Sequence, residues 1–145
     1  NASALHRRAG ASWSTYADEV MTTLERRPRE AVSFALYGLD DLTLAWNLAH
    51  SLTLDESGLW QELAKRYEKV DPLAVLPIHT QVVLADLEHA DAGFYRSAAR
   101  RLARMRKLAS GSPEADEVDE LIADLRETHR RRPRLQLEFD KAGLP

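Results

Sequence analysis

The fold is decided by two stretches of the chain that align without a gap: Leu59-Trp60-Gln61-Glu62-Leu63-Ala64-Lys65-Arg66-Tyr67-Glu68-Lys69-Val70 and Phe94-Tyr95-Arg96-Ser97-Ala98-Ala99-Arg100-Arg101-Leu102-Ala103-Arg104-Met105. In both stretches the apolar residues recur at the period of an amphipathic helix, and the alignment sets Leu59 against Phe94, an offset of 35 residues. The predicted helix before each stretch repeats at the same offset. It aligns Leu48, Ala49 and Leu52 with Val83, Leu84 and Leu87, respectively. One offset shared by two consecutive helices predicts a repeated helical hairpin, visible in two copies.

The first copy also approximates a known repeat signature. Its Trp60-x2-Leu63-Ala64-x2-Tyr67 pattern corresponds to the first half of a tetratricopeptide (TPR) repeat with alanine in place of the usual glycine, and the second half is absent. We therefore predict an all-α fold of stacked antiparallel helix pairs, a TPR-like, right-handed α-solenoid of about seven or eight helices with atypical ends. A plain helical bundle is the alternative.

Start and stop signals divide the rest of the chain into further helices. An apolar stripe predicts a first helix through Trp13, Tyr16, Ala17, Val20, Met21 and Leu24. Five later sites carry signals for a helix start. Pro28 suits a first turn, and Asp40-Asp41 and Asp55 suit N-caps. Asp71-Pro72 begins another helix, and Ser112-Pro113 is a cap followed by proline at the first helical position. The predicted stops are at Gly38, Gly93, Gly111 and Gly143, the last after a short helix from Leu135 to Lys141.

Pro77 lies too far inside one of these predicted helices to be tolerated without disturbance. A proline there removes a backbone hydrogen bond and clashes with the preceding turn. We therefore expect either a kink or a new helix start at this residue.

Composition limits the class of protein. The chain has 145 residues, 44% of them apolar and 30% charged, which is typical of one globular domain. It has no cysteine, which excludes disulfides, thiolate metal ligands and cysteine nucleophiles, and which agrees with a reducing, cytoplasmic location. No apolar run approaches the roughly 18 residues that span a bilayer, so we expect no membrane partner.

The ends and the charge distribution carry two further expectations. Asn1-Ala2 resembles the remnant of a cleaved expression tag, so we expect a single helical-repeat domain over residues 3–145 of a longer protein. The net charge is −3, but residues 1–93 carry 8 basic and 14 acidic side chains, whereas residues 94–134 carry 11 basic and 7 acidic ones. The basic groups are therefore concentrated in the later part of the chain.

A family resemblance adds to this interpretation. It is carried by Leu44-Ala45-Trp46-Asn47-Leu48-Ala49, Trp60-Gln61-Glu62-Leu63-Ala64, Pro72-Leu73-Ala74-Val75-Leu76-Pro77, Tyr95-Arg96-Ser97-Ala98-Ala99 with Leu102 and Lys107-Leu108, and Leu125-Arg126-Glu127-Thr128-His129-Arg130-Arg131-Arg132-Pro133. From about Leu42 onward the chain resembles the C-terminal helical region of bacterial SWIM zinc finger proteins. The family's zinc ligands, three cysteines and a histidine, cannot occur here, so the resemblance implies an upstream zinc finger domain in the full-length protein. The resemblance implies an intracellular protein that binds proteins or nucleic acids. It assigns no functional role to any individual residue of this chain.

The sequence offers little catalytic chemistry, and we expect a protein that is not an enzyme and needs no cofactor. There is no glycine-flanked serine elbow, and the six glycines are scattered singly, so no phosphate-cradling loop is formed. Asp86-x2-His89 could place two metal ligands on adjacent helical turns, but no matching ligand set accompanies it. We expect Trp13, Trp46 and Trp60 to pack in the core.

The candidate binding surface is basic. Arg96, Arg100, Arg104 and Lys107 recur at spacings that place them on one helical face, with Arg101 beside them. If the next helix packs antiparallel, its end brings Arg130, Arg131, Arg132 and Arg134 close to Arg96 and Arg100. The joint patch would attract phosphate backbones or an acidic protein surface. An exposed, solvated arginine face neutralised by acids between Glu114 and Asp124 is the structural alternative.

These features lead to competing hypotheses. The first is a non-catalytic interaction or scaffold domain that binds a protein partner. The second is an accessory nucleic-acid-binding domain that binds DNA or RNA through the residues 96–107 and 129–134. An enzyme or ligand-binding bundle with an unrecognised site, and a spacer for the upstream finger, also fit the sequence.

Overall fold

The computed structural model describes residues 27–145. The predicted helix from Trp13 to Leu24 lies outside them. The described part is all-helical, which confirms the predicted class. Its elements are α3 (Pro28–Ser33), a π-helical turn η1 (Phe34–Gly38), α4 (Leu42–Ser51), α5 (Ser57–Tyr67), α6 (Leu76–Asp86), α7 (Ala92–Ala109), α8 (Glu114–Thr128) and α9 (Pro133–Lys141).

The chain divides into two compact units between Leu63 and Ala64. This division does not test whether residues 3–145 form a single domain, which stays a prediction. No helix in residues 27–145 is both long enough and apolar enough to cross a membrane.

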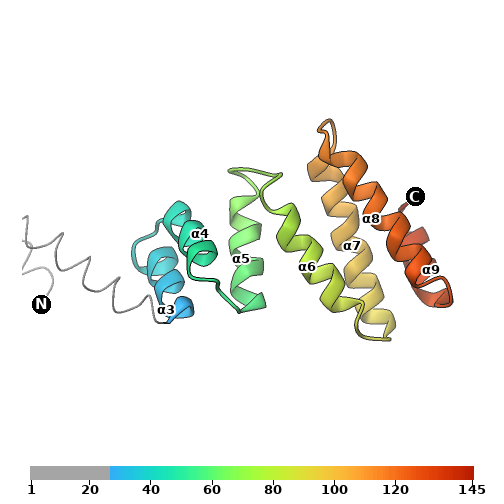
Figure 1. The fold of residues 1–145 in the computed structure, drawn as a ribbon, viewed down its shortest axis with the longest axis horizontal. Coiled ribbons are helices and arrows are strands. Elements are labelled where there is room, and N and C mark those ends of the chain that lie inside the picture. The colour runs from blue at the N-terminus through green and yellow to red at the C-terminus, as the bar shows by residue number, and fades with distance from the viewer. Residues whose placement is uncertain (1–26) are drawn as a thin grey trace, which may run out of the picture. The chain divides into compact units, whose positions relative to one another are not determined.

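In the first unit, α3 and η1 pack against α4 (Figure 1). Pro28 stands in the first turn of α3 as predicted, and Gly38 ends η1, where a Cβ would lie only 2.9 Å from the ring of Phe34. Asp41 caps α4 by accepting a hydrogen bond from the amide of Leu44 at 3.0 Å. The preceding Asp40 takes a left-handed backbone conformation with φ of 50° rather than sharing the cap.

Two tryptophans organise the packing of α5 on α4. Trp46 is buried, and its ring meets the ring of Trp60 edge-on with centroids 6.0 Å apart. Trp60 is half-buried and donates a hydrogen bond from Nε1 to the carbonyl of Leu54 at 2.7 Å. His50 packs against both rings. The expected core role is therefore confirmed for Trp46, whereas Trp60 packs at the edge of the core and Trp13 lies outside the described residues.

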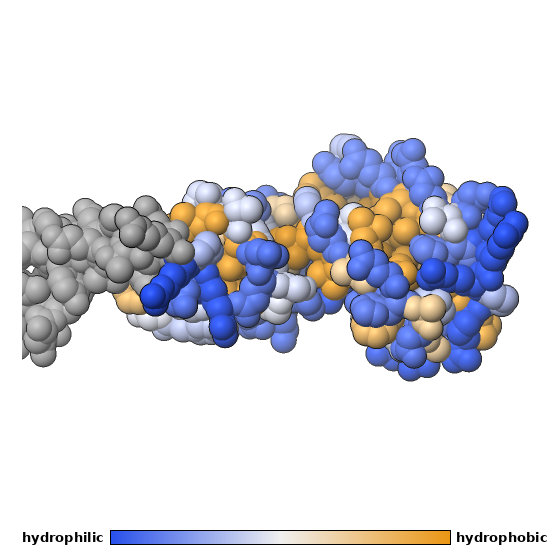
Figure 2. Space-filling model, turned by 60° about the horizontal axis from the view of Figure 1, so that its bottom comes forward, coloured by the Kyte–Doolittle hydropathy of each residue, from blue (hydrophilic) through white to orange (hydrophobic). Residues whose placement is uncertain are grey.

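In the second unit, α7 is the central element and packs against α6, α8 and α9 (Figure 1). It is 18 residues long and buries one face made of Tyr95, Ala98, Ala99, Leu102, Met105 and Ala109. The helices around it supply the remaining core residues, including the fully buried Ile122, Leu135 and Phe139. Polar and charged side chains cover most of the molecular face drawn in Figure 2, with apolar residues gathered between them.

The prediction of a helix start at Asp71-Pro72 is wrong, because residues 72–75 form a turn in which the carboxylate of Asp71 accepts hydrogen bonds from the amides of Leu73 and Ala74. A new helix starts at Leu76 and places Pro77 in its first turn. Of the two outcomes expected at Pro77, a kink or a new helix start, the structure has the second.

The other helix boundaries agree with the sequence signals at most sites and differ at three. Asp91, rather than Gly93, marks the start of α7, because its carboxylate accepts hydrogen bonds from the amides of Gly93 and Phe94. Similarly, α5 begins at Ser57, two residues after the expected cap Asp55.

The third difference concerns the start of α8. Ser112 was expected to cap this helix, but its hydroxyl donates back to the carbonyl of Ala109 at the end of α7. Gly111 ends α7 with φ of +79°, a conformation that favours glycine. The helix therefore begins one residue later than expected, at Glu114.

The 35-residue offset reappears in the helix boundaries. α4 and α6 end at Ser51 and Asp86, and α5 and α7 begin at Ser57 and Ala92. Burial does not repeat as closely, because Val70 is 59% exposed whereas its counterpart Met105 is 1% exposed. The stacked, right-handed TPR-like arrangement stays a prediction.

Arg126 of α8 holds the last residues of the chain in place. Its guanidinium donates to the carbonyls of Pro145 at 2.6 Å and Leu144 at 3.1 Å, and to the side chains of Gln136 and Asp140, each at 2.9 Å. It also lies 5.5 Å from the centre of the Phe139 ring. One side chain therefore ties α8 to α9 and to the segment after it.

We expect Arg126→Ala to lower the free energy of unfolding by about 2 kcal/mol, because several charge-assisted hydrogen bonds are lost together. Urea denaturation followed by circular dichroism measures this change. Arg130→Ala is the matched control. Arg130 makes one exposed ion pair, with Glu127 three residues earlier, so its removal costs about 0.5 kcal/mol or less. An equal loss of unfolding free energy in the two variants would show that the contacts of Arg126 with the end of the chain do not stabilise the fold.

Candidate functional site

The structure brings the two predicted groups of basic residues together at one buried carboxylate. Glu138 of α9 is only 4% exposed, and its Oε2 lies 3.6 Å from Nε of Arg96 on α7. Its Oε1 lies 3.2 Å from Nε of Arg134 and 4.0 Å from Nζ of Lys141. The start of α7 and the start of α9 are thus adjacent, as the antiparallel packing of α7 and α8 predicted. Because burial of an unpaired carboxylate is costly, these cations also stabilise the fold.

Other predicted residues are paired with acids as well. Arg104 forms an ion pair with Glu68, and Arg130 pairs with Glu127 at 2.9 Å. The acids between Glu114 and Asp124 do not neutralise this surface as expected. The one ion pair in residues 27–145 that involves them joins Asp119 to Arg106, which lies outside the predicted set.

Two of the predicted arginines are half-buried and contact the protein interior. Arg101 directs its Nη1 at Nδ1 of His79 on α6, 2.8 Å away. Arg132 donates to the carbonyl of Leu87 at 3.2 Å and lies 5.9 Å from the centre of the Tyr95 ring. Each ties together two elements of the second unit.

Three of the predicted cations are exposed and have no ion pair with any described residue: Arg100, Lys107 and Arg131. They do not lie at one place. Arg100 is on α7 midway between the paired Arg96 and Arg104, Lys107 is near the end of the same helix, and Arg131 is in the connection from α8 to α9. Lys107 lines a hollow beside Arg106, and Arg131 lines one with Arg130 and Arg132. Among the hollows of the described residues, Arg100 lies in the concave site that holds the most arginines.

That site is a shallow cleft of about 400 Å³ along α7, which we call the arginine cleft. It is lined by His79, Gly93, Arg96, Ser97, Arg100, Arg101 and Arg104. Four of its seven residues are arginines, because positions 96, 100 and 104 follow one helical face and 101 lies beside it. The first and last arginines of this row are each paired with an acid, Arg96 with Glu138 and Arg104 with Glu68. The cleft is therefore basic, and the charges of its outer arginines are balanced by carboxylates of the chain.

His79 was missed by the sequence analysis, yet it is the most unusual residue of the cleft. It is 6% exposed, and burial first and the charge of Arg101 second lower its pKa to about 4. Arginine can only donate, so Nδ1 of His79 accepts, and the neutral ring carries its proton on Nε2. That Nε2 is buried and has no hydrogen-bond partner in the described residues. Asp86, on the same helix, favours the charged form of Arg101 and so opposes the lowering of its pKa by burial.

A weak signal for His79 does exist in the sequence. It lies between Leu76 and Val83 at helical spacing, so it belongs to the apolar face of α6. Nothing in the pattern, however, pairs it with a residue 22 positions later.

The candidate metal pair does not form on one helix. Asp86 is the last residue of α6, whereas His89 lies beyond it and stacks on Phe94 with ring centroids 4.1 Å apart. Residues 27–145 contain no group of three or more potential metal ligands.

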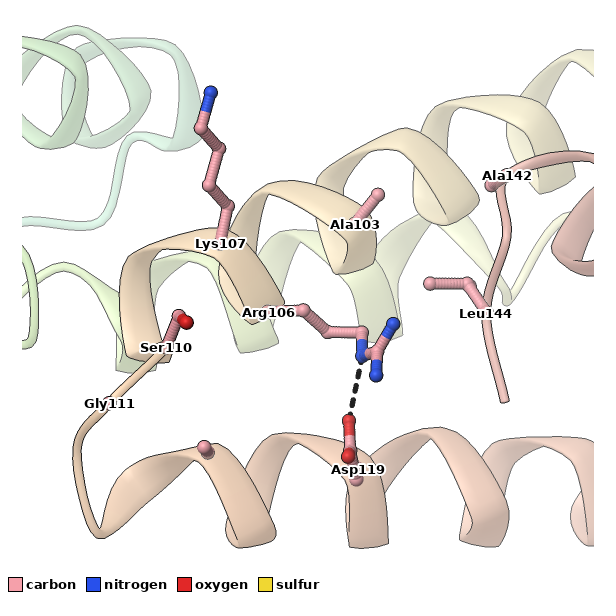
Figure 3. Close-up of a pocket in the computed structure, with 9 residues that line it drawn as sticks. Ala103, Arg106, Lys107, Ser110, Gly111, Asp119, Ala142 and Leu144 are labelled. Atoms are coloured by element: carbon pink, nitrogen blue, oxygen red, sulfur yellow. Dashed lines mark hydrogen bonds and ion pairs between the residues drawn. The ribbon is translucent and has the colours of Figure 1, made fainter.

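A second hollow, of about 490 Å³, lies between α7, α8 and the last residues of the chain (Figure 3). Its main polar feature is the hydrogen-bonded ion pair of Arg106 and Asp119, 2.8 Å long. Lys107 points away from this pair, and the side chain of Leu144 points toward the space beside it (Figure 3). The ion pair joins α7 to α8 and leaves Lys107 as the charged residue of the hollow that has no ion pair with a described residue.

The buried, neutral His79 predicts a pH-dependent stability. Its folded pKa of about 4 lies below the ordinary value of 6.5, so the unfolded chain takes up a proton that the folded chain does not. Stability is then fully present above pH 6.5 and is lost as the pH falls toward 4, by up to about 3 kcal/mol.

His79→Gln keeps an acceptor for Arg101 but cannot titrate. We expect the free energy of unfolding of this variant to fall less steeply between pH 6.5 and 4 than that of the wild type. Urea denaturation at several pH values measures both slopes, and the carboxylates common to both proteins cancel in the difference. Identical slopes would show that His79 is not held neutral.

Comparisons of the chain with models of protein families, with curated proteins and with solved structures found no match.

Proposed function

We propose that this chain is a non-catalytic helical-repeat interaction domain of a larger cytoplasmic bacterial protein, and that it binds a protein partner. The observation that carries the proposal is the arginine cleft, where Arg96, Arg100 and Arg104 follow one another along α7. A row of guanidinium groups recognises carboxylates with good geometry, because each can donate two parallel hydrogen bonds. We therefore propose that the partner contributes a short acidic segment.

The pairing of the outer arginines with acids supports a protein rather than a nucleic acid. Arg96 and Arg104 are eight residues apart on one helix, which separates their Cα atoms by about 12 Å. A nucleic acid strand that followed this row would carry its phosphates past Glu138 and Glu68, whose negative charges repel them. A short acidic segment can end before it reaches either carboxylate.

Nucleic-acid binding is the second candidate, and one observation favours it. Arg96 and Arg134 meet at Glu138, so the basic face of α7 is continuous with the basic connection from α8 to α9. Against it stands the pairing of Arg96, Arg104, Arg130 and Arg134 with acids of the chain itself, since paired arginines release fewer counterions from a phosphate backbone.

The resemblance to the helical region of SWIM zinc finger proteins agrees with either candidate. Under the proposal, the upstream zinc finger belongs to the same protein, and the helical domain supplies its protein contact. The predicted TPR-like stacking would place the arginine cleft on the surface of a helical repeat, where such proteins bind their partners.

Fluorescence anisotropy with labelled probes separates the two candidates. The probes are a glutamate-rich peptide and single- and double-stranded DNA and RNA, each titrated at about 50 and 200 mM salt. We expect the peptide to bind and the double variant Arg100→Glu, Arg104→Glu to weaken that binding at least about tenfold, because two guanidinium groups become carboxylates. Arg131→Glu, an exposed arginine outside the cleft, serves as the control and should have little effect. Steeply salt-dependent binding of nucleic acid that both variants weaken, without peptide binding, would replace the proposal with the second candidate.

A further inference from the structure

We infer that the arginine cleft takes a phosphate monoester group, carried by a side chain of the protein partner, with Arg100 as its central contact. This inference rests on the proposed function, because it names the chemistry of the acidic group that the cleft recognises. It is carried by three features of the cleft: an uncommitted arginine, two flanking arginines on carboxylates, and a buried histidine that keeps an unused donor.

The first feature is the position of Arg100. It is exposed, lines the cleft, and has no ion pair with any residue in the described part of the chain. Its neighbours one helical turn away on either side, Arg96 and Arg104, are each bound to a carboxylate and are about half exposed, at 48% and 46%. An anion at Arg100 therefore has one arginine ready and two more within reach of a side-chain rotation.

The second feature is competition with the chain's own acids. A partner carboxylate carries the same single charge as Glu138 and Glu68 and would gain little by drawing Arg96 or Arg104 away from them. A phosphate monoester carries nearly two charges at neutral pH and has three strong acceptor oxygens. It can therefore engage Arg100 together with one or both neighbours, which makes it the better match for three arginines at successive turns.

The third feature is His79, which lines the same cleft from α6. It is 94% buried, and its Nε2 carries a proton that no described residue accepts. A buried donor without a partner costs free energy, and Nε2 itself is closed to solvent, so a phosphate oxygen can accept its proton only if the side chains that cover it shift when the ligand binds. Because Arg101 holds His79 through Nδ1, this donor stays uncharged and oriented.

The compactness of the cleft favours a single phosphate group over a phosphodiester chain. The carboxylates of Glu138 and Glu68 pair with the first and last arginines of the row, so a second phosphate along the row would compete with negative charge already bound there. A phosphorylated serine or threonine in an otherwise neutral segment meets neither carboxylate. The site thus recognises one modified side chain rather than a polyanion.

The test compares three fluorescein-labelled peptides of glycine, alanine and serine that differ only at a central residue, which is phosphoserine, glutamate or serine. The chain is used intact, and anisotropy is recorded at about 50 mM salt. We expect the phosphoserine peptide to bind at least about tenfold more tightly than the glutamate peptide, and the serine peptide not to bind. We also expect Arg100→Gln to weaken phosphopeptide binding by about tenfold, while the matched Arg131→Gln, an exposed arginine outside the cleft, leaves it unchanged.

A second readout is the pH dependence of binding. The second ionisation of a phosphate monoester has a pKa of about 6, so lowering the pH from about 7.5 to 5.5 removes most of its second charge and should weaken the phosphopeptide several-fold. The glutamate side chain of the peptide stays ionised over this range, and His79, whose pKa burial lowers to about 4, stays neutral. The glutamate peptide should therefore bind equally at both pH values.

The outcomes separate this inference from the proposed function. Equal binding of the phosphoserine and glutamate peptides, both dependent on Arg100, would overturn the phosphate inference and leave the acidic-segment proposal standing. Failure of both these peptides and of the glutamate-rich peptide would overturn both. Tighter binding of a 5′-phosphorylated trinucleotide than of the phosphopeptide would overturn the assignment to a protein side chain.

Discussion

Burial of one face of α7 is the interaction on which the second unit depends. Leu102 and Met105 are almost completely buried, and Ala98 and Ala99 allow α6 and α9 to approach closely because their side chains are small. Each large apolar side chain removed from water contributes roughly 2 kcal/mol. Once this face is buried, the helical period leaves positions 96, 100, 104 and 107 on the opposite side, so the same packing that stabilises α7 also displays its basic residues.

Intramolecular carboxylates then decide how much of that basic charge is available. Glu138 and Glu68 bind the arginines at the two ends of the row, and the interior contacts of Arg101 and Arg132 hold these two side chains against neighbouring helices. The result is a cleft with a free cation at its centre rather than a uniformly basic surface. A long polyanion requires many free cations, whereas a single compact anion requires only a few that converge. This difference is the physical basis for proposing a protein partner.

The polar contacts between α6 and α7 add a second constraint. His79 and Arg101 share a hydrogen bond inside a mostly apolar contact, and Asp86 favours the charge on Arg101. Such groups lower stability relative to apolar packing, but they fix the orientation of the guanidinium and of the imidazole ring. The cleft is therefore lined from α6 by His79, which Arg101 holds by a hydrogen bond, and from α7 by the exposed arginines Arg96, Arg100 and Arg104.

Periodicity in the sequence alone determined the all-helical class and the placement of Arg96, Arg100, Arg104 and Lys107 on one face of α7, because these depend on neighbours within a few positions. At Pro77 the sequence left a kink and a new helix start equally open, and the structure has the new start. Which acids neutralise that face was decided only by the tertiary structure: the expected acids of α8 do not reach it, whereas Glu68 and Glu138 do. The contact of His79 with Arg101 was likewise invisible, because it joins two helices across 22 residues of sequence. Helical period reports which side of a helix a residue occupies. It carries no information about which residue of another helix stands opposite, since that depends on how the buried faces pack.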